Sequence, residues 1–397
     1  MRWFTRERAA PDRVLALLWG TNALSFESLP STDKDNHFNL LRLVAACSVI
    51  ISHAYALSAG PDRWDPLERL IGFDLGTAAV IAFFAISGYF ISLSFLRRQS
   101  NFGFIVARAT RIIPGLLVVS VFAAFVVGPI VTTLPLPAYF TERSVWLYSL
   151  QNISIVKVMA SSLPGVFGGN PVPNYVNGSL WTLFYEVSCY VGLFAVGVLG
   201  FLRRERFFWV ILAWAPVYVF ARYFGPKDLH YFASFSLPFI VGMAVYQFRP
   251  LNILNGWVAL VLILVAAGLG YAGHGVEELW SFAVAYGILW AGFARAPALL
   301  AYNKIGDFSY GTYIYGFLVG QTLADLIPGI GIAPLMAASL VIALACGVFS
   351  WFCVEHPALE LRKVLSWQRC RSAASSLLPR IRQFQRAESE GDSQAPG

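Results

Sequence analysis

Ten apolar segments run through this 397-residue chain, each close to the length that a helix needs to cross a bilayer. They occupy residues 39–58, 75–95, 112–133, 178–199, 207–224, 230–247, 253–272, 277–294, 306–327 and 331–353. Because lipid cannot satisfy backbone polar groups, only helices and closed barrels span membranes, and the alternating ten-residue strands of a barrel are absent. The sequence therefore predicts an all-α, polytopic membrane helical bundle with about ten transmembrane helices.

The composition agrees with this class of protein. Hydrophobic residues make up 57% of the chain and charged residues 13%, and the mean hydropathy is +0.62. A soluble protein of this length is far more polar. The five cysteines lack CxxC spacing, so we expect neither a disulfide framework nor a metal site.

Basic residues in the short loops predict how the chain is oriented. Residues 96–111 carry four arginines and no acid, and residues 203–206 read RRER, whereas residues 59–74 hold four acids against two arginines. Since Lys and Arg accumulate on the cytoplasmic side, both termini are predicted to be cytoplasmic. The net charge of +7 is then explained mainly by the basic residues that orient the chain in the membrane, and no nucleic-acid partner is expected. We expect a multi-pass protein of the inner (plasma) membrane.

Three regions are predicted along the chain. Residues 1–35 form a cytoplasmic N-terminal arm, residues 36–365 the transmembrane domain, and residues 366–397 a cytoplasmic tail. The tail is rich in Ser, Arg and Glu, a composition typical of disorder. We find no inverted repeat of the kind known from many transporters, and the oligomeric state is left open.

Two ionisable residues lie within the first apolar segment, Arg42 and His53. Eleven helical positions of about 100° each bring them to nearly the same face, about 16 Å apart along the axis. Ionisable groups at membrane depth are costly and usually face a protein interior or an aqueous cavity, which indicates a functional site. The alternative is an arginine that snorkels to the interface and a histidine bonded to a neighbouring helix.

A second polar stripe lies in the fourth apolar segment, where Thr182, Glu186 and Tyr190 recur at four-residue spacing. This spacing puts all three on one helix face, which suits a cavity and not lipid. Counting about 1.5 Å per residue from the segment ends places Glu186 level with His53, which lies in the outer half of the bilayer. The alternative is that Glu186 pairs with a histidine or tyrosine only to fix helix packing.

A different chemistry is predicted at the cytoplasmic end, where Arg42, Arg108 and Arg111 converge. The guanidinium group binds phosphate bidentately and keeps its charge, so these arginines suit an anion pocket. The alternative is that these arginines only orient the chain, because basic residues accumulate at the cytoplasmic ends of membrane helices. For Arg97 and Arg98 this alternative is favoured.

Smaller polar groups accompany the arginines on the second and ninth helices. The Ser87–Gly88 pair offers a hydroxyl and lets another backbone come close, a pattern that most often indicates helix packing. Ser309, Tyr310 and Tyr313 place hydroxyls in the cytoplasmic half, where an aromatic belt explains a tyrosine about as well as a ligand does. Ser87 and Tyr313 are therefore candidate ligand contacts.

The order of these features resembles the integral-membrane acyltransferase-three family over residues 36–365. The matching pieces are Arg42 with His53, FFAISGYF at 83–90, the RxxR of Arg108 and Arg111, SLWTLFYEVSCY at 179–190, SYGTYIYGF at 309–317 and VEHP at 354–357. The resemblance implies a ten-helix core and a catalytic histidine that corresponds to His53. It also implies O-acyl transfer from cytoplasmic acetyl-CoA to a carbohydrate at the outer face, such as an exopolysaccharide, an O-antigen or a lipid-linked oligosaccharide.

The chain departs from the family pattern in three places. It has a long N-terminal arm, and no esterase-like domain is appended, so no relay through a second domain is expected. Gly316 and Phe317 stand where many relatives place a histidine, so no histidine function is expected there.

The resemblance also suggests how the residues would divide the work. Arg42, Arg108 and Arg111 would hold the phosphates of CoA, with Ser87 and Tyr313 as further donor contacts, and the pantetheine arm would run up the bundle.

At the outer end, His53 would act as a general base toward the acceptor hydroxyl or carry the acyl group covalently, and both routes stay open. Glu186 would orient the imidazole and stabilise its cation. The loop at 134–177 is long enough to form a lid or groove for the acceptor.

Two other classes of protein also fit the helices. A proton-coupled secondary transporter of a small polar or anionic solute would have buried His and Glu as well, and inverted repeats would favour it. A scaffold subunit without chemistry explains the helices but leaves His53 and Glu186 unexplained. The enzyme is the favoured interpretation once the family resemblance is included, whereas depth and charge alone do not favour it.

Overall fold

The computed structural model describes residues 36–361 except 64, 98–99, 156–160, 252 and 295–296, and every regular element within them is a helix. The all-α prediction is thus confirmed for the described part of the chain. The predicted arm at 1–35, the tail at 366–397 and Arg98 lie outside the described residues.

Each of the ten predicted apolar segments coincides with a helix. These are α2 (Phe38–Ala59), α4 (Leu75–Arg97), α5 (Asn101–Phe122) continued by η2 (Ala123–Val127) and α6 (Gly128–Val131), α9 (Trp181–Val198), α10 (Phe207–Tyr223), α11 (Lys227–Gln247), α12 (Gly256–Tyr271), α13 (Glu277–Phe293), α14 (Ser309–Leu326), and α15 (Ile332–Ser350) continued by η5 (Trp351–Glu355). Six stretches are long and apolar enough to cross a membrane, namely α2, α4, residues 101–131, α9, α11 and residues 332–361. The shorter helices α10 and α12 are also apolar. The chain is a multi-pass membrane protein, and its sidedness stays a prediction.

The third membrane helix begins earlier than predicted, at Asn101. Ser100 is its N-cap, and the Ser100 hydroxyl accepts a hydrogen bond from the backbone N–H of Gly103 at 3.3 Å. The prediction that residues up to 111 form a loop is therefore wrong, because Arg108 and Arg111 lie inside α5. A search for apolar segments does not find this first part of the helix, because its arginines face a polar cavity and not lipid.

Short helices replace parts of the predicted loops. They are α3 (Pro66–Ile71), α7 (Leu136–Thr141) and α8 (Arg143–Ser154), together with the 3₁₀ helices η3 (Arg249–Leu251) and η4 (Pro297–Lys304). Proline stands in the first turn of α3 and α7, where its missing N–H would have no intrahelical partner. The predicted 134–177 loop is therefore helical in its first half, and α8 packs along α5.

The helix α4 packs against α2, α11 and α13. Its crossing with α11 brings two backbones together through glycines on both helices. A Cβ atom at Gly88 would overlap the carbonyl oxygen of Phe239, and one at Gly242 would overlap the carbonyl oxygen of Ala85. The close backbone approach predicted for the Ser87–Gly88 pair is confirmed, with α11 as the partner.

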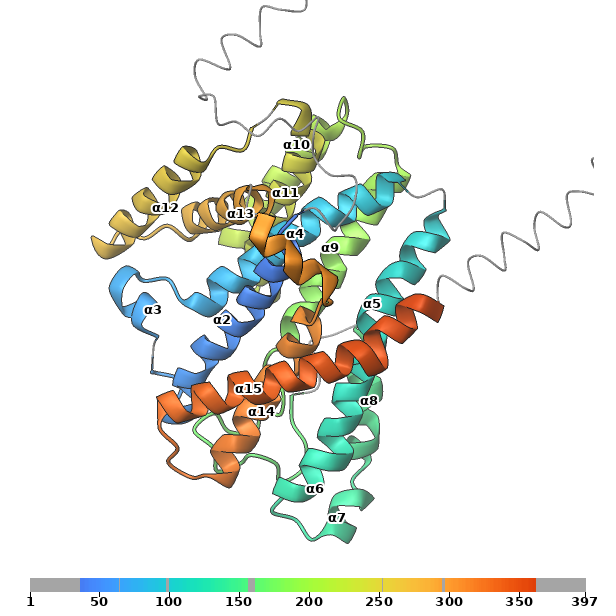
Figure 1. The fold of residues 1–397 in the computed structure, drawn as a ribbon, viewed down its shortest axis with the longest axis vertical. Helices are drawn as coiled ribbons and strands as arrows, with labels where there is room; N and C mark the ends of the chain where they lie inside the picture. Colours follow the sequence, from blue (N-terminus) through green and yellow to red (C-terminus); the bar gives the residue numbers. More distant parts are fainter. Residues whose placement is uncertain are drawn as a thin grey trace, which may run out of the picture.

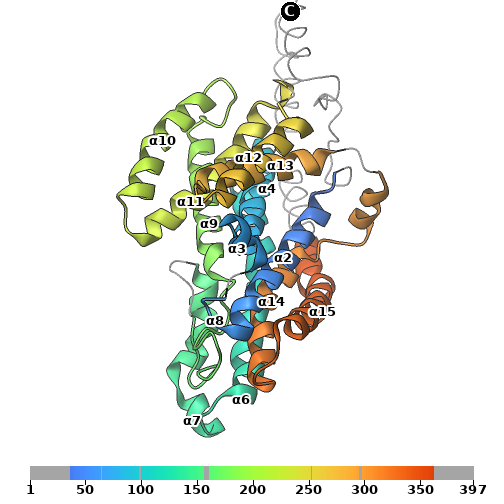
Figure 2. The ribbon, with the colours of Figure 1, turned by 90° about the vertical axis from the view of Figure 1, so that its left-hand side faces the viewer.

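Two groups of helices lie at opposite ends of the bundle. Figure 1 shows α6 and α7 at one end and α10 to α13 at the other. Figure 2 shows α10 on the outer side of α11, against which it packs. Large apolar side chains such as Trp209, Phe220, Trp257 and Leu264 are exposed on α10 and α12, as lipid contact requires.

Candidate active site

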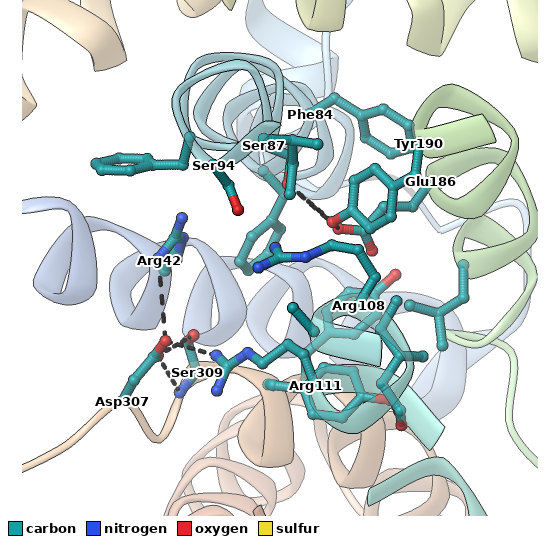
Figure 3. Close-up of a pocket in the computed structure, with 18 of the residues that line it drawn as sticks. Arg42, Phe84, Ser87, Ser94, Arg108, Arg111, Glu186, Tyr190, Asp307 and Ser309 are labelled. Carbon is teal, nitrogen blue, oxygen red and sulfur yellow. Dashed lines mark hydrogen bonds and ion pairs between the residues drawn. The ribbon is translucent and has the colours of Figure 1, made fainter. Parts of the chain in front are cut away.

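A cavity of about 700 Å³ lies between α2, α4, α5, α9 and α14. Its polar lining includes Asn39, Arg42, Ser87, Ser94, Arg97, Arg108, Arg111, Thr182, Glu186, Tyr190, Asp307, Ser309, Tyr310 and Tyr313. Figure 3 shows the guanidinium groups of Arg42, Arg108 and Arg111 pointing toward the same space. The structure thus brings together every sequence-predicted site residue except His53. Thr182, Glu186 and Tyr190 all line the cavity, so the predicted polar face of this helix is confirmed.

The cavity carries an excess of positive charge. Its lining holds four arginines, which are Arg42, Arg97, Arg108 and Arg111, but only two carboxylates, which are Glu186 and Asp307. A surplus of guanidinium groups in a partly dehydrated cavity favours a multivalent anion such as a phosphate ester.

Arg111 is held on two sides by carboxylates. Its Nη2 atom lies 2.5 Å from Oδ2 of Asp307, and its Nη1 atom lies 3.4 Å from Oε2 of Glu355. The rings of Tyr310 and Trp351 have their centroids 5.9 and 5.8 Å from the guanidinium carbon. Arg111 therefore joins α5 to the start of α14 and to the end of α15.

The sequence interpretation did not assign Asp307 and Glu355 to the site. Oδ1 of Asp307 accepts a hydrogen bond from the Ser309 hydroxyl at 2.5 Å, and Oε1 of Glu355 accepts one from the Ser350 hydroxyl at 3.0 Å. Glu355 ends η5, a π-helical turn, and such a turn re-aims the side chains that follow it. A charge count could have found both acids, because each flanks an apolar segment at the end where the arginines gather.

Asp307 lies in the segment before α14, outside the membrane-spanning helices. Burial acts to raise the pKa of its carboxyl, but the guanidinium groups of Arg111 and Arg42 outweigh burial and hold the pKa below its ordinary value. Nη1 of Arg42 lies 3.9 Å from Oδ2 of Asp307. Asp307 therefore stays ionised and is shared between the two arginines.

Glu186 binds two hydroxyls inside the cavity. Its Oε1 atom accepts a hydrogen bond from Tyr190 and another from the Ser87 hydroxyl at 3.2 Å (Figure 3). Within the part of the chain that the structure describes, no hydrogen bond or ion pair joins Glu186 to His53. The predicted contact between Glu186 and the imidazole is thus absent from this structure, because Ser87 and Tyr190 hold the carboxylate.

His53 is not among the residues that line the cavity. Its ring meets the ring of Phe317 edge-on, with the centroids 5.1 Å apart. Phe317 lies one helical turn after Tyr313, whose hydroxyl donates to the carbonyl oxygen of Ser179 at 2.8 Å and lies 2.5 Å from the Thr182 hydroxyl. One face of α14 therefore leads from the cavity, through Tyr313, to His53.

Residues 170–175 are fastened along the same helix, α14, by the buried amide of Gln321. Oε1 of Gln321 accepts a hydrogen bond from Asn170 Nδ2 at 2.8 Å, and Nε2 of Gln321 donates to the carbonyl oxygens of Val172 and Tyr175 at 2.7 and 2.8 Å. Gln321 is fully buried. This part of the predicted 134–177 loop is therefore tied to the helix whose Phe317 touches His53.

The fold and the cavity define a multi-pass membrane protein with a positively charged cavity of about 700 Å³ inside its bundle. Residues 35–354 match the family model described as an acyltransferase domain, and the chain belongs to this acyltransferase-three family. The family resemblance drawn from the motifs is confirmed, and the protein is an acyltransferase.

Two relatives are similar over most of their length. An O-acetyl transferase of Shigella phage Sf6 is 31% identical over 336 residues, which cover 81% of this chain and 95% of the relative. Nodulation protein 10 of Rhizobium leguminosarum bv. viciae is 30% identical over 371 residues, which cover 85% of this chain and 97% of the relative. No solved structure matches the chain.

Proposed function

We propose that this acyltransferase moves an acetyl group from cytoplasmic acetyl-CoA to a hydroxyl of a surface or lipid-linked carbohydrate at the outer face of the inner membrane. The observation that carries the proposal is the cavity, whose lining holds four arginines against two carboxylates. Phosphate groups of CoA match that charge. The relative that is an O-acetyl transferase supports acetyl as the group transferred.

The donor enters with its phosphates against Arg42 and Arg108, while Arg111 adds charge from its fixed place between two carboxylates. The hydroxyls of Ser87 and Tyr313 line the path along which the pantetheine arm extends. The arm has amide and hydroxyl groups that need hydrogen bonds once water is excluded. Its thioester end then approaches the α14 face that leads to His53.

The reaction exchanges one ester bond for another. In the general-base route, His53 takes the proton from the acceptor hydroxyl, the oxygen attacks the thioester carbonyl, the C–S bond breaks, and the CoA thiolate collects a proton. In the covalent route, the imidazole nitrogen attacks the thioester carbonyl, the C–S bond breaks and the CoA thiolate collects a proton. The acceptor oxygen then attacks the acetyl carbon, the C–N bond to the imidazole breaks, and the released imidazole takes the proton of the acceptor hydroxyl. The imidazole nitrogens of His53 form no hydrogen bond with the described residues, which leaves them available for either route.

The acceptor is a carbohydrate, such as an exopolysaccharide, an O-antigen or a lipid-linked oligosaccharide. Tyr175 is 51% exposed on the segment that Gln321 fastens beside α14. An exposed aromatic ring offers an apolar surface to the face of a sugar. Membrane lipid around the helices would keep a lipid-linked acceptor close to this segment.

Mass spectrometry of surface glycans and lipid-linked oligosaccharides tests the proposal in cells with the wild-type gene, without it, and with His53→Ala. We expect an ester-linked acetyl group that is present in the wild type alone. Glycans that are identical in all three strains would argue against a carbohydrate acceptor.

The same protein in nanodiscs separates the enzyme from a transporter. An acyltransferase releases the free thiol of CoA when acetyl-CoA and the deacetylated glycan of the knockout strain are supplied together. A proton-coupled transporter would move solute into vesicles without releasing thiol.

A further inference from the structure

The orientation of a reacting imidazole is usually fixed by a hydrogen bond from one ring nitrogen to a carboxylate or a carbonyl group. His53 forms no such bond with the described residues, and the carboxylate of Glu186 is held by Ser87 and Tyr190 instead. The His53 ring does meet the ring of Phe317, with the centroids 5.1 Å apart and the two planes at 86°. How firmly the imidazole is held therefore depends on what holds Phe317.

Two glycines bring α14 close to α2 on either side of His53. A Cβ atom at Gly316 would lie 2.5 Å from Cγ1 of Ile50, and one at Gly320 would lie 2.7 Å from Cδ1 of Leu57. Ile50 stands three residues before His53 and Leu57 four residues after it, so the three share one face of α2. Small residues at four-residue spacing let membrane helices approach closely. The backbone of α14 therefore lies against α2 at the level of the imidazole.

The chain that leads into α9 is fastened to α14 by two buried hydrogen bonds. Nδ2 of Asn177 donates to the carbonyl oxygen of Ile314 at 2.7 Å, and the Tyr313 hydroxyl donates to the carbonyl oxygen of Ser179 at 2.8 Å. Asn177 and Ser179 are both buried. On α14 these two anchors lie three and four residues before Phe317, which is one helical turn.

Gly178 lies between the two anchored residues and packs against the ring of Phe317. A Cβ atom at Gly178 would lie 2.7 Å from both Cε2 and Cζ of Phe317, so only glycine fits here without moving the ring. The hydrogen bonds on both sides of Gly178 keep its backbone from retreating. The buried ring of Phe317 is thus held at one edge by backbone, and it contacts the partly exposed imidazole of His53.

We propose that Phe317 positions the imidazole of His53 and that Gly178, together with Gly316 and Gly320, holds the Phe317 ring in place. The edge-to-face contact restricts rotation of the imidazole, so that a ring nitrogen stays aligned with the reacting groups. Phe317 is a positioning residue: it takes no proton and forms no bond with the acetyl group. This inference rests on the proposed function, in which His53 reacts, and it applies to the general-base and the covalent route alike.

The test compares Phe317→Leu with the wild type in thiol release by the full-length protein in nanodiscs, with acetyl-CoA and the deacetylated glycan of the knockout strain. Leucine fills much of the same space but has no planar ring, so we expect kcat to fall about tenfold or more. The KM for acetyl-CoA and the affinity for CoA should change by less than about twofold, because Phe317 does not line the cavity. Phe207→Leu is the matched control, since it removes a buried ring that packs on Phe248 away from the cavity, and its kcat should equal that of the wild type.

Gly178→Ala tests the same contact without altering Phe317 itself. The added methyl group must displace the ring, so kcat should fall as it does in Phe317→Leu. In the double variant there is no ring left to displace, and the two losses should not add. Gly192→Ala is the control, because a Cβ atom there has no neighbour within 4 Å.

Three outcomes overturn the inference while His53→Ala is inactive. They are a kcat of Phe317→Leu within about twofold of the wild type, an equal loss of kcat in Phe207→Leu, and losses in Phe317→Leu and Gly178→Ala that add in full. A loss of CoA affinity as large as the loss of kcat would also overturn it, because general damage to the fold produces that pattern. Full activity in His53→Ala would instead contradict the proposed function.

Discussion

At the scale of single residues, the structure separates two kinds of arginine that look alike in the sequence. Arg111 has two carboxylate partners, Asp307 and Glu355, and Glu355 is only 1% exposed. Arg108 lines the same cavity and points into it (Figure 3). We therefore expect substitution of Arg111 to affect folding and substitution of Arg108 to affect ligand binding.

Replacing Arg111 by Ala should lower the free energy of unfolding by about 3–5 kcal/mol, because it leaves a buried carboxylate without its cation. Arg111→Lys keeps the positive charge but not the planar guanidinium group that can bind two carboxylates at once. It should therefore recover only part of the lost free energy of unfolding. Thermal unfolding in detergent measures both variants. An Arg111→Ala protein as stable as the wild type would show that the ion pairs do not support the fold.

Replacing Arg108 by Ala should weaken acetyl-CoA binding by roughly 1.5–3 kcal/mol, which is about 10- to 150-fold, with a smaller salt dependence. Calorimetry of CoA binding to purified protein in nanodiscs provides the isotherms. His53→Ala is the control and should bind CoA like the wild type. The division into a donor end and a reacting end is wrong if His53→Ala loses CoA affinity while Arg108→Ala keeps it.

His53→Ala itself should lower acetyl transfer by about 10²–10⁴-fold, since the imidazole supplies proton transfer or a nucleophile. Its loss should cost little stability, because the ring forms no hydrogen bond with the described residues. Thiol release from acetyl-CoA and the melting temperature are measured on the same preparation. Transfer at the wild-type rate in this variant would remove His53 from the mechanism.

At the scale of helices, the crossing of α4 and α11 depends on glycine. A methyl group at Gly88 or at Gly242 would overlap a carbonyl oxygen of the other helix, so Gly88→Ala or Gly242→Ala should cost about 1–3 kcal/mol. Gly192 on α9 has no atom within 4 Å of its Cβ position, and Gly192→Ala is the matched control. Melting temperatures in detergent compare the three variants. Equal stability of all three would show that α4 and α11 can separate without cost.

The second element-scale prediction concerns the segment that Gln321 fastens to α14. Gln321→Ala removes three side-chain hydrogen bonds, each worth about 1 kcal/mol, and should speed hydrogen exchange in residues 170–178. Thr322→Ala is the control, because among the described residues the Thr322 hydroxyl donates only to the carbonyl oxygen of Leu318 in its own helix. Exchange rates that are the same in both variants would show that other contacts hold the segment.

At the scale of the whole molecule, the proposed reaction needs a donor from one side of the membrane and an acceptor from the other. A cysteine placed at Asn101 should react with a membrane-impermeant maleimide only from the cytoplasm, and one placed at Asn174 only from outside. Both positions are exposed, and the background must lack the five native cysteines. The reverse pattern would exchange the donor and acceptor sides together.

The sequence by itself determined where the apolar helices lie and which face of the fourth one is polar. Hydrophobic length is a local property that the bilayer imposes on each segment, so α2, α4 and α9 were located to within a few residues. The four-residue spacing of Thr182, Glu186 and Tyr190 likewise predicted that they share one helix face, because helical periodicity is also a local property. The arginine-rich start of α5 was missed, because a helix that faces a charged cavity does not look like one that faces lipid.

Only the tertiary structure decided which polar groups meet. The sequence placed Glu186 and His53 at one depth, but depth does not determine direction, and Glu186 faces Ser87 and Tyr190 instead. Asp307 and Glu355 reach Arg111 from segments far away in the chain. These pairings depend on the angles at which the helices cross and on how each helix is rotated about its axis. Close packing at residues such as Gly88 sets that geometry, and the spacing of residues within a single helix does not encode it.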